Sequence, residues 1–431
     1  MINSPKKVPP EVSNMAANLI PSEIIKLGNE INNLIKSGVN VFNLTIGDFD
    51  PEIFPIPKEL TAFIIEAYQK GYTNYPAANG VPELRNALSG FIQEKLGLDY
   101  SPEEILISGG SRPLIYATYR TIVDEGDTVI YAVPSWNNNH YCHLSGAKKV
   151  ELEVGQEQNF MPHAEDLKPH LSEAVLLALC SPQNPTGTVF DKNTLLEICQ
   201  LVLEENQRRK GNRKPLYILY DQIYWQLCFG ELEHVDPVSL VPELRDYVIY
   251  IDGLSKVYAA TGIRVGWSFG PIEIMNKMRA ILSHVGAWAP KAEQMATAWF
   301  LKKDGASQHY LNWFKPEIEF RLKSLYNGLS SLSKQGYPIE VIEPQGAIYL
   351  TVRIPWKNKL VQEGEILSQQ KDVTRYLLDT CKVALVPFKA FGSSDESEWY
   401  RLSVGTLRKE DIPTILNQIK EGMDQFVSLN K

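Results

Sequence analysis

Hydrophobic residues in the middle of the chain form short runs that are apolar at consecutive positions. This pattern is typical of strands buried on both faces of a sheet, and helical stretches such as Leu195–Glu205 separate most of the runs. The runs span Ile105–Ser108, Thr128–Val133, Val175–Ser181, Leu216–Tyr220, Val248–Ile251 and Val265–Gly270. Alternating strands and helices predict an α/β fold with a mainly parallel sheet. The short gap before the last run leaves room for that strand to run antiparallel.

The two ends of the chain show a different pattern. Apolar residues recur at helical spacing before Gly38, at Ile24, Leu27, Ile31, Leu34 and Ile35. Beyond residue 290, two helical segments and three strand-like runs follow, at Lys291–Leu301, Pro316–Gln335, Gly346–Val352, Val383–Pro387 and Tyr400–Val404. We therefore predict a large domain over residues 45–290. Residues 1–44 and 291–431 are expected to form a smaller α+β domain.

Composition narrows the functional classes. A chain of 431 residues with 44% hydrophobic residues is long enough for two cores, and its net charge of −8 gives no electrostatic reason to bind nucleic acid. No run reaches the ~20 apolar residues of a membrane span, and the N-terminus lacks the apolar core of a signal peptide. Five cysteines without CxxC spacing argue against a disulfide framework or a zinc site. We expect a cytoplasmic protein without a metal centre.

Five consecutive predicted strands are each followed by polar, aromatic or glycine-rich residues. These residues are, in order, Gly109-Gly110-Ser111, Pro134 with Trp136, Asn184-Pro185-Thr186-Gly187, Asp221 with Tyr224, and Gly253-Leu254-Ser255-Lys256. In open α/β sheets, ligands bind beyond the carboxyl ends of the parallel strands. All five groups would therefore face one crevice, which is the candidate active site.

In this order, the motifs resemble those of the class I and II aminotransferases, pyridoxal-phosphate (PLP) enzymes with the aspartate-aminotransferase fold (fold type I). The most specific segment is Ser-Lys-Val-Tyr-Ala-Ala-Thr-Gly-Ile-Arg-Val-Gly-Trp at 255–267, and Asn-Pro-Thr-Gly at 184–187 comes next. The resemblance extends from Asn43 to Ser403. It implies a PLP-dependent aminotransferase that moves an amino group from an L-amino acid to a 2-oxo acid by a ping-pong mechanism.

The resemblance also implies catalytic roles. Lys256 would hold the cofactor as a Schiff base and, once released, would move the Cα proton as general acid and base. Asp221 would pair with the pyridinium nitrogen, so that the ring can accept electrons. Tyr224 and Asn184 would hydrogen-bond the phenolic oxygen of the cofactor. Trp136 would stack on the pyridine ring.

The phosphate group of the cofactor needs several donors. The resemblance assigns it to the backbone amides of Gly110 and Ser111, at a helix N-terminus, and to the guanidinium group of Arg264. Many family members also carry a serine three residues before the lysine, where this chain has Gly253. Ser255 is the candidate substitute. The set of phosphate ligands is therefore expected to be smaller than in those members.

Three further residues match the family at positions far from the lysine. Tyr75 resembles the tyrosine that members lend across a dimer interface to the partner's phosphate site, which implies a homodimer. A packed loop tyrosine is the alternative. Arg401 resembles the arginine that binds the substrate α-carboxylate, and Gly47 resembles the glycine that lines the same pocket.

The substrate side chain stays open. Some aspartate-specific relatives place a lysine directly after the paired glycines, where this chain has Ser111 followed by Arg112. Trp136 and Trp288 are candidates to line the pocket and would favour an aromatic or bulky apolar side chain. Aspartate, aromatic and broad specificities are therefore all retained.

Other functions are also considered. A C–S lyase or a related lyase on the same scaffold would share the cofactor motifs, so the sequence discriminates it poorly. A PLP-binding transcription regulator carries a basic helix-turn-helix domain ahead of this fold. We expect no such domain, since the residues before Asn43 are few and not markedly basic. A nicotinamide-dependent oxidoreductase is disfavoured because no GxGxxG motif opens a helix after an early strand.

Overall fold

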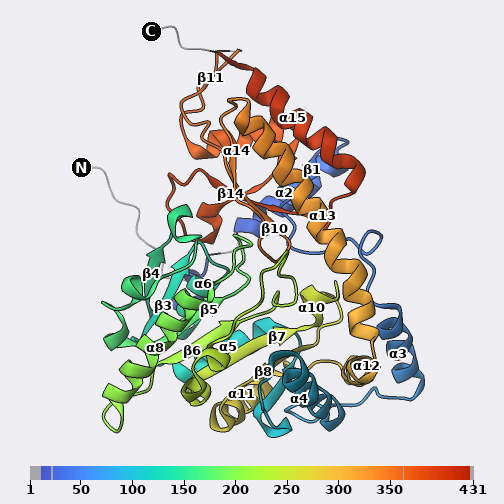
Figure 1. Cartoon of the computed structure of the whole chain (residues 1–431), viewed down its shortest axis with the longest axis vertical. Coiled ribbons are helices and arrows are strands. Elements are labelled where there is room, and N and C mark those ends of the chain that lie inside the picture. Colours follow the sequence, from blue (N-terminus) through green and yellow to red (C-terminus); the bar gives the residue numbers. More distant parts are fainter. Residues whose placement is uncertain (1–10, 21–22, 363, 428–431) are drawn as a thin grey trace.

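The computed structural model describes residues 11–20, 23–362 and 364–427, and its lower part in Figure 1 is built on a seven-stranded sheet. The strand order is β2-β8-β7-β6-β5-β3-β4. The strands are β2 (Ile105–Ser108), β3 (Thr128–Val133), β4 (Lys148–Glu153), β5 (Ala174–Cys180), β6 (Tyr217–Asp221), β7 (Val248–Gly253) and β8 (Gly266–Phe269). Neighbours pair in parallel except β8, which is antiparallel to both β2 and β7. The α/β fold with a mainly parallel sheet is confirmed.

Helices cover both faces of this sheet, which explains why its strands are apolar at consecutive positions. In β6, Ile218 and Tyr220 face one core, whereas Leu219 between them faces another. The first core includes residues of α4 (Pro82–Leu96), α8 (Lys192–Arg209) and α12 (Lys291–Lys302). The second includes residues of α5 (Ser111–Ile122) and α11 (Ile272–Val285). Each buried Leu or Ile contributes about 1.5–3 kcal/mol.

The edge strand β4 was not predicted from the sequence. Its residues are exposed or half-buried, and four of the six are charged: Lys148, Lys149, Glu151 and Glu153. Charged residues are common on edge strands because they discourage pairing with other chains. A search for runs of consecutive apolar residues does not detect such a strand.

The upper part contains a four-stranded antiparallel sheet in the order β13-β14-β10-β9. Its strands are β9 (Glu340–Val341), β10 (Tyr349–Arg353), β13 (Val386–Pro387) and β14 (Trp399–Ser403). The N-terminal segment joins this part, because β1 (Phe42–Asn43) pairs in parallel with β12 (Val383–Ala384). Ile31 of α2 (Glu23–Lys36) is buried with Leu378 and Ala384. The seven-stranded sheet thus lies within residues 45–290, although the domain limits themselves stay a prediction.

The remaining elements are shorter or peripheral. They are α1 (Asn14–Ala17), α3 (Lys58–Gln69), α6 (Asn138–Ser145), α7 (Ala164–Leu167), α9 (Pro237–Leu240), α10 (Leu254–Val257), α14 (Gln370–Asp379), α15 (Ile412–Asp424) and the pair β11 (Leu360–Val361) with β15 (Phe426–Val427). Among the helices of the described residues, none has the length and apolar character needed to cross a membrane.

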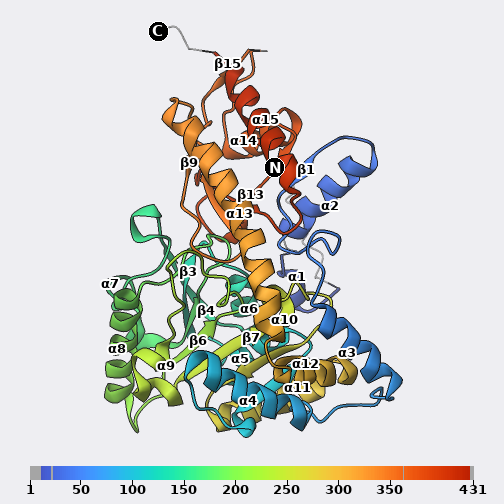
Figure 2. The same cartoon turned by 45° about the vertical axis from the view of Figure 1, so that its right-hand side comes forward.

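One long helix, α13 (Ala306–Lys334), runs from the lower part to the upper part in both views (Figures 1 and 2). The predicted start at Pro316 is wrong, since that proline lies inside the helix. A proline favours the first turn of a helix and interrupts the hydrogen bonding of a helix interior. Here Tyr310 and Phe314, on the N-terminal side of the proline, are buried in the core. Their packing stabilises the turns that the proline weakens.

Candidate active site

A cavity of about 520 Å³ opens beside the carboxyl ends of β5 and β6, and its lining includes α10 and β14. Its volume falls within the range of small-molecule sites. Most of the predicted site residues line it: Gly47, Ser111, Trp136, Asn184, Asp221, Tyr224, Ser255, Lys256, Arg264 and Arg401. Gly110 directly precedes the lining residue Ser111. Of the predicted residues, Tyr75 lies outside the cavity.

Lys256 lies in α10, directly after β7. Its Nζ donates a hydrogen bond to the carbonyl oxygen of Gly47 at 2.5 Å. Burial lowers the pKa of Lys256 to about 8; Asp48 acts in the opposite direction, and the nearby arginines lower the pKa further. A lysine with this pKa presents an unprotonated amine near neutral pH far more often than an exposed lysine does. This amine can therefore act as a nucleophile or as a base.

Asp221 is the last residue of β6. Its Oδ1 accepts a hydrogen bond from the backbone N–H of Ile223 at 3.1 Å. Burial raises the pKa of Asp221 to about 6, while that hydrogen bond and the charge of Lys256 oppose the rise. The carboxyl group is thus mainly ionised at pH 7, and any cationic nitrogen beside it would favour the ionised form further.

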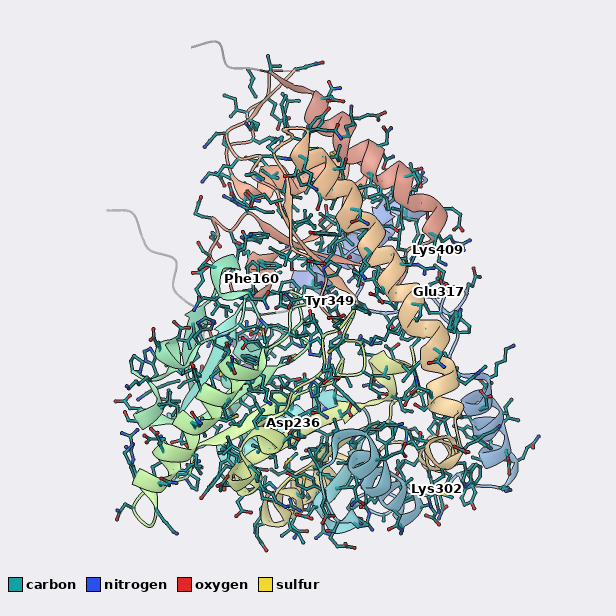
Figure 3. All side chains as sticks on the ribbon, in the orientation of Figure 1. Phe160, Asp236, Lys302, Glu317, Tyr349 and Lys409 are labelled. Atoms are coloured by element: carbon teal, nitrogen blue, oxygen red, sulfur yellow. The ribbon has the colours of Figure 1, made fainter. Side chains whose placement is uncertain are left out.

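A pair of tyrosines closes the cavity between the two parts of the molecule. The hydroxyl groups of Tyr224 and Tyr349 lie 2.7 Å apart, and their rings meet edge to face at 5.6 Å. Figure 3 places Tyr349 where the upper part meets the lower. A Cβ atom on Gly47 would lie 2.8 Å from the Tyr349 hydroxyl, so a larger residue there would require the tyrosine to shift. Tyr349 was not predicted as a site residue, because a tyrosine near the start of a strand carries no motif.

Arg401, in β14, is only 1% exposed. Its Nη1 donates to Oδ1 of Asn184 at 2.9 Å and its Nη2 donates to the carbonyl oxygen of Thr45 at 2.7 Å, whereas its Nε has no partner among the described residues. Burial lowers the pKa of Arg401, and the groups that oppose this effect are Tyr349 and Tyr224 rather than a carboxylate. A buried guanidinium of this kind is suited to bind an anionic ligand.

A second place for an anion lies at the N-terminus of α5. Gly110 caps this helix with φ +97° and offers no side-chain acceptor to the first-turn amides. Arg264 packs against the same loop, and its Nη2 donates to the carbonyl oxygen of Gly109 at 2.9 Å. A Cβ atom on Gly266 would lie 2.7 Å from the amide nitrogen of Ser111, so the loop rests directly on β8. Free amides beside a guanidinium form a typical phosphate site.

The glycine that replaces the expected serine has a steric reason. A Cβ atom on Gly253 would lie 3.0 Å from both the Cα of Gly266 and the carbonyl oxygen of Val265. A serine at this position would therefore require the adjacent backbone of Val265 and Gly266 to shift by a few tenths of an ångström. Ser255 is 7% exposed and lines the cavity, as its suggested role requires.

Two predicted aromatic residues lie in different places. Trp136 lines the cavity, and the guanidinium carbon of Arg112 lies 5.2 Å from the centre of its ring. Trp288 is not among the residues that line this cavity of the single chain, so its place beside the substrate stays a prediction. It packs edge to face on Tyr75 at 5.1 Å, and Tyr75 is 80% exposed. Within this single chain, Tyr75 lies on the surface, whereas Trp288 beneath it is half-buried.

The family follows from a comparison over most of the chain. Residues 39–419 match the family model described as aminotransferase class I and II. The chain belongs to this family. Members are PLP-dependent enzymes, and this aminotransferase uses PLP to transfer amino groups between amino acids and 2-oxo acids. The resemblance noted in the sequence is confirmed.

Individual relatives agree with the family. The aminotransferase is 28% identical to an aspartate aminotransferase of Bacillus sp. (strain YM-2), over 96% of this chain and 99% of the relative. The crystal structure of the Rhizobium meliloti aspartate aminotransferase superposes with a TM-score of 0.88 at 25% identity, covering 97% of this chain and 100% of that one. The Thermus thermophilus aspartate aminotransferase with maleate gives 0.83 at 26% identity, covering 95% and 99%.

The cavity of the aminotransferase fits PLP by the chemistry of its walls. It offers an amine with a lowered pKa for the aldehyde group, a carboxylate for the ring nitrogen and uncapped helix amides for the phosphate. The Nε of Arg401 without a protein partner leaves a further donor for a substrate carboxylate. The groups present in the cavity are therefore of the kinds that PLP and an amino acid substrate would need.

Proposed function

We propose that Lys256 holds PLP and moves the proton in the amino-transfer reaction. Bound PLP supplies an aldehyde that condenses with amines and a ring that accepts an electron pair from the substrate. The observation that carries the proposal is the buried Lys256 amine, with its lowered pKa, in one cavity with Asp221 and the N-terminus of α5. Freed from the cofactor, the amine takes a proton from the substrate Cα atom and later returns it.

The other wall residues orient and tune this chemistry. Asp221 holds a proton on the ring nitrogen, which requires an ionised carboxylate at that position. Tyr224 and Asn184 donate hydrogen bonds to the phenolic oxygen, and Trp136 packs on the ring. The amides of Gly110 and Ser111 bind the phosphate, together with the side chains of Arg264 and Ser255.

Arg401 binds the α-carboxylate of the substrate, and Gly47 lines the same pocket. Because Arg401 belongs to the predicted small domain and Lys256 to the large one, a bound amino acid contacts both. Binding would therefore favour closure of the domains and exclude water from the cavity. The division into residues 45–290, and residues 1–44 with 291–431, is part of this proposal.

We infer that the active form is a homodimer in which Tyr75 reaches the partner's phosphate site. Tyr75 is 80% exposed and does not line the chain's own cavity, so it is accessible to another chain. Sedimentation should give twice the 48.7 kDa mass of the chain. A monomer with full activity would exclude this role.

We place the enzyme in the cytoplasm, where amino acids and 2-oxo acids are exchanged.

For the substrate, we propose an amino acid with an acidic side chain. Relatives named aspartate aminotransferase match nearly the whole chain. On the cavity wall, the guanidinium of Arg112 lies over Trp136 rather than beside a carboxylate of the described chain. A planar guanidinium can accept a second carboxylate with two hydrogen bonds.

A panel of L-amino acids with 2-oxoglutarate or pyruvate tests the function. We expect amino-group transfer that requires the 2-oxo acid, with aspartate and glutamate as the best donors. The Arg112→Ala variant should prefer aspartate and glutamate over the donor L-alanine less strongly than the parent does. Its rate with L-alanine itself should be unchanged. Release of ammonia without an added 2-oxo acid would show the lyase alternative instead. Equal rates with aromatic and acidic donors would contradict the proposed preference for acidic donors, but not the proposed transamination.

A further inference from the structure

A buried carboxyl group lies behind the cavity and outside the residues that line it. Asp252, next to last in β7, is 2% exposed. Its Oδ1 accepts a hydrogen bond from the backbone N–H of Gly253 at 2.7 Å, and its Oδ2 accepts one from the indole Nε1 of Trp225 at 2.9 Å. An acid at this depth is costly unless it is well bonded. An apolar residue would fill the space without that cost, so the carboxyl group calls for a functional reason.

The two bonds of Asp252 reach two different turns. Trp225 directly follows Tyr224, in the turn that begins at Asp221. Gly253 opens the turn that leads to Lys256. At this edge of the sheet, the backbone hydrogen bonds between β6 and β7 end with the one from the amide of Gln222 to the carbonyl oxygen of Ile251, at 3.0 Å. Beyond that point, the side-chain hydrogen bond between Trp225 and Asp252 connects the two segments.

We propose that Asp252 is a positioning residue, which ties the turn carrying Asp221 and Tyr224 to the turn carrying Lys256. The proposal rests on the proposed role of Lys256. Asp252 and Trp225 do not line the cavity, so they would act only through the geometry of these neighbours. Displacing a catalytic group by about 1 Å can cost a hundredfold in rate. A rigid link between the two turns keeps the amine in place against the ring and its carboxylate partner.

The surroundings of Asp252 are consistent with a tight link. Trp225 is itself buried and meets the ring of Phe91 edge to face at 6.2 Å. On the other side, Gly253 packs closely on Gly266, since a Cβ atom on Gly253 would lie 3.0 Å from the Cα of Gly266. Neither hydrogen-bond donor can therefore move without disturbing packed neighbours. Burial raises the pKa of Asp252 to about 8, and the charge of Asp221 adds to the rise.

Trp225→Phe and Asp252→Asn, singly and together, test the proposal in the holoenzyme. Trp225→Phe keeps an aromatic ring and removes one N–H, so it is the milder variant. The matched control is Asp236→Asn, a buried aspartate that accepts a hydrogen bond from the Tyr250 hydroxyl at 2.6 Å and does not line the cavity (Figure 3). The measurements are kcat, KM, the visible spectrum of the bound cofactor and Tm.

We expect each single variant at Asp252 or Trp225 to lower kcat by about tenfold to a hundredfold, with KM changed by less than about threefold. The visible spectrum should shift, because the amine and its surroundings change. The kcat of the double variant should be no lower than that of the less active single variant, because each substitution removes the same link. Asp236→Asn should lower Tm and leave both kcat and the spectrum unchanged.

Two results would overturn the proposal. One is that the variants at Asp252 and Trp225 lose as much Tm as the control variant does, while their kcat and visible spectrum stay unchanged. The other is a double variant whose loss in kcat is the product of the single losses, which would mean that Asp252 does not act through Trp225. Neither result bears on the attachment of PLP to Lys256, which borohydride reduction tests separately.

Discussion

The lower wall of the cavity comes mainly from consecutive strand ends of one sheet, whereas the upper wall is assembled from segments far apart in the chain. Asp221 ends β6, and Lys256 follows the neighbouring parallel strand β7. Gly47 follows β1, and Tyr349 and Arg401 lie on paired antiparallel strands of the smaller sheet. The two walls meet at the Tyr224–Tyr349 hydrogen bond and at the bond from Lys256 to Gly47.

This difference in construction corresponds to a difference in task. The strand ends of a sheet packed on both faces hold their side chains rigidly, as proton transfer and electron withdrawal require. The upper wall carries the buried guanidinium of Arg401, which suits a group that binds and releases substrate. A change in the lower wall should therefore affect every amine substrate, and a change in the upper wall should affect carboxylates most.

The largest effect is expected from Asp221→Asn, in the lower wall. The amide is nearly isosteric with the carboxylate, so the fold should persist. The ring nitrogen loses its charge partner, and kcat should fall on the order of a thousandfold or more for all amine substrates. Steady-state kinetics with several donors measure this loss. Turnover near that of the parent would show that Asp221 is not the partner of the ring nitrogen.

Next in size is Arg401→Lys, in the upper wall. A lysine ammonium cannot make the two parallel hydrogen bonds of a guanidinium. For amino acids, kcat/KM should fall by about a hundredfold, or about 3 kcal/mol. PLP should stay bound with an unchanged spectrum, and amines without a carboxylate should lose much less. Equal losses for both kinds of amine would break the division of tasks between the walls.

The rate at which PLP attaches to the apoenzyme should rise by about tenfold per pH unit below pH 8. The pKa of Lys256 is lowered to about 8, so the unprotonated amine increases as pH rises toward 8 and then levels off. The rate at which the apoenzyme takes up PLP should follow this curve. An unshifted lysine would instead give a rate that keeps rising to about pH 10. Stopped-flow absorbance between pH 6 and pH 10 would distinguish the two curves.

The smallest effect is expected from Tyr349→Phe, at the contact between the walls. The change removes one buried hydrogen bond to Tyr224, worth about 1 kcal/mol, or about fivefold in kcat/KM. Tyr224→Phe should cost more, since it also removes the donor to the cofactor. Adding Tyr349→Phe to that variant should then have almost no further effect. Additive losses would show that Tyr349 acts independently of Tyr224.

The sequence predicted the lower wall better than the upper one for a physical reason. Parallel strands buried on both faces leave an unmistakable apolar pattern, and the groups that follow them must gather at one edge of the sheet. Asp221 and Lys256 could be placed in this way before any family was considered. By contrast, the edge strand β4 was missed because its charged residues suit an exposed edge rather than a core.

The upper wall depends on contacts that no local pattern records. Arg401 was found only through its resemblance to a family segment. Tyr349 was missed, although its strand was expected, because nothing nearby marks it as part of a site. Trp288 was a pocket candidate by residue type alone, and in the single chain it packs against Tyr75. The start of α13 was misplaced because tertiary packing of Tyr310 and Phe314 outweighs the local effect of Pro316.

The central claim is that Lys256 holds the cofactor, and borohydride reduction tests it most directly. The holoenzyme is reduced, digested and searched for the peptide that carries the cofactor. We predict that the cofactor is found on Lys256 alone, and that Lys256→Ala yields no labelled peptide. Attachment to any other lysine would contradict the account of both walls.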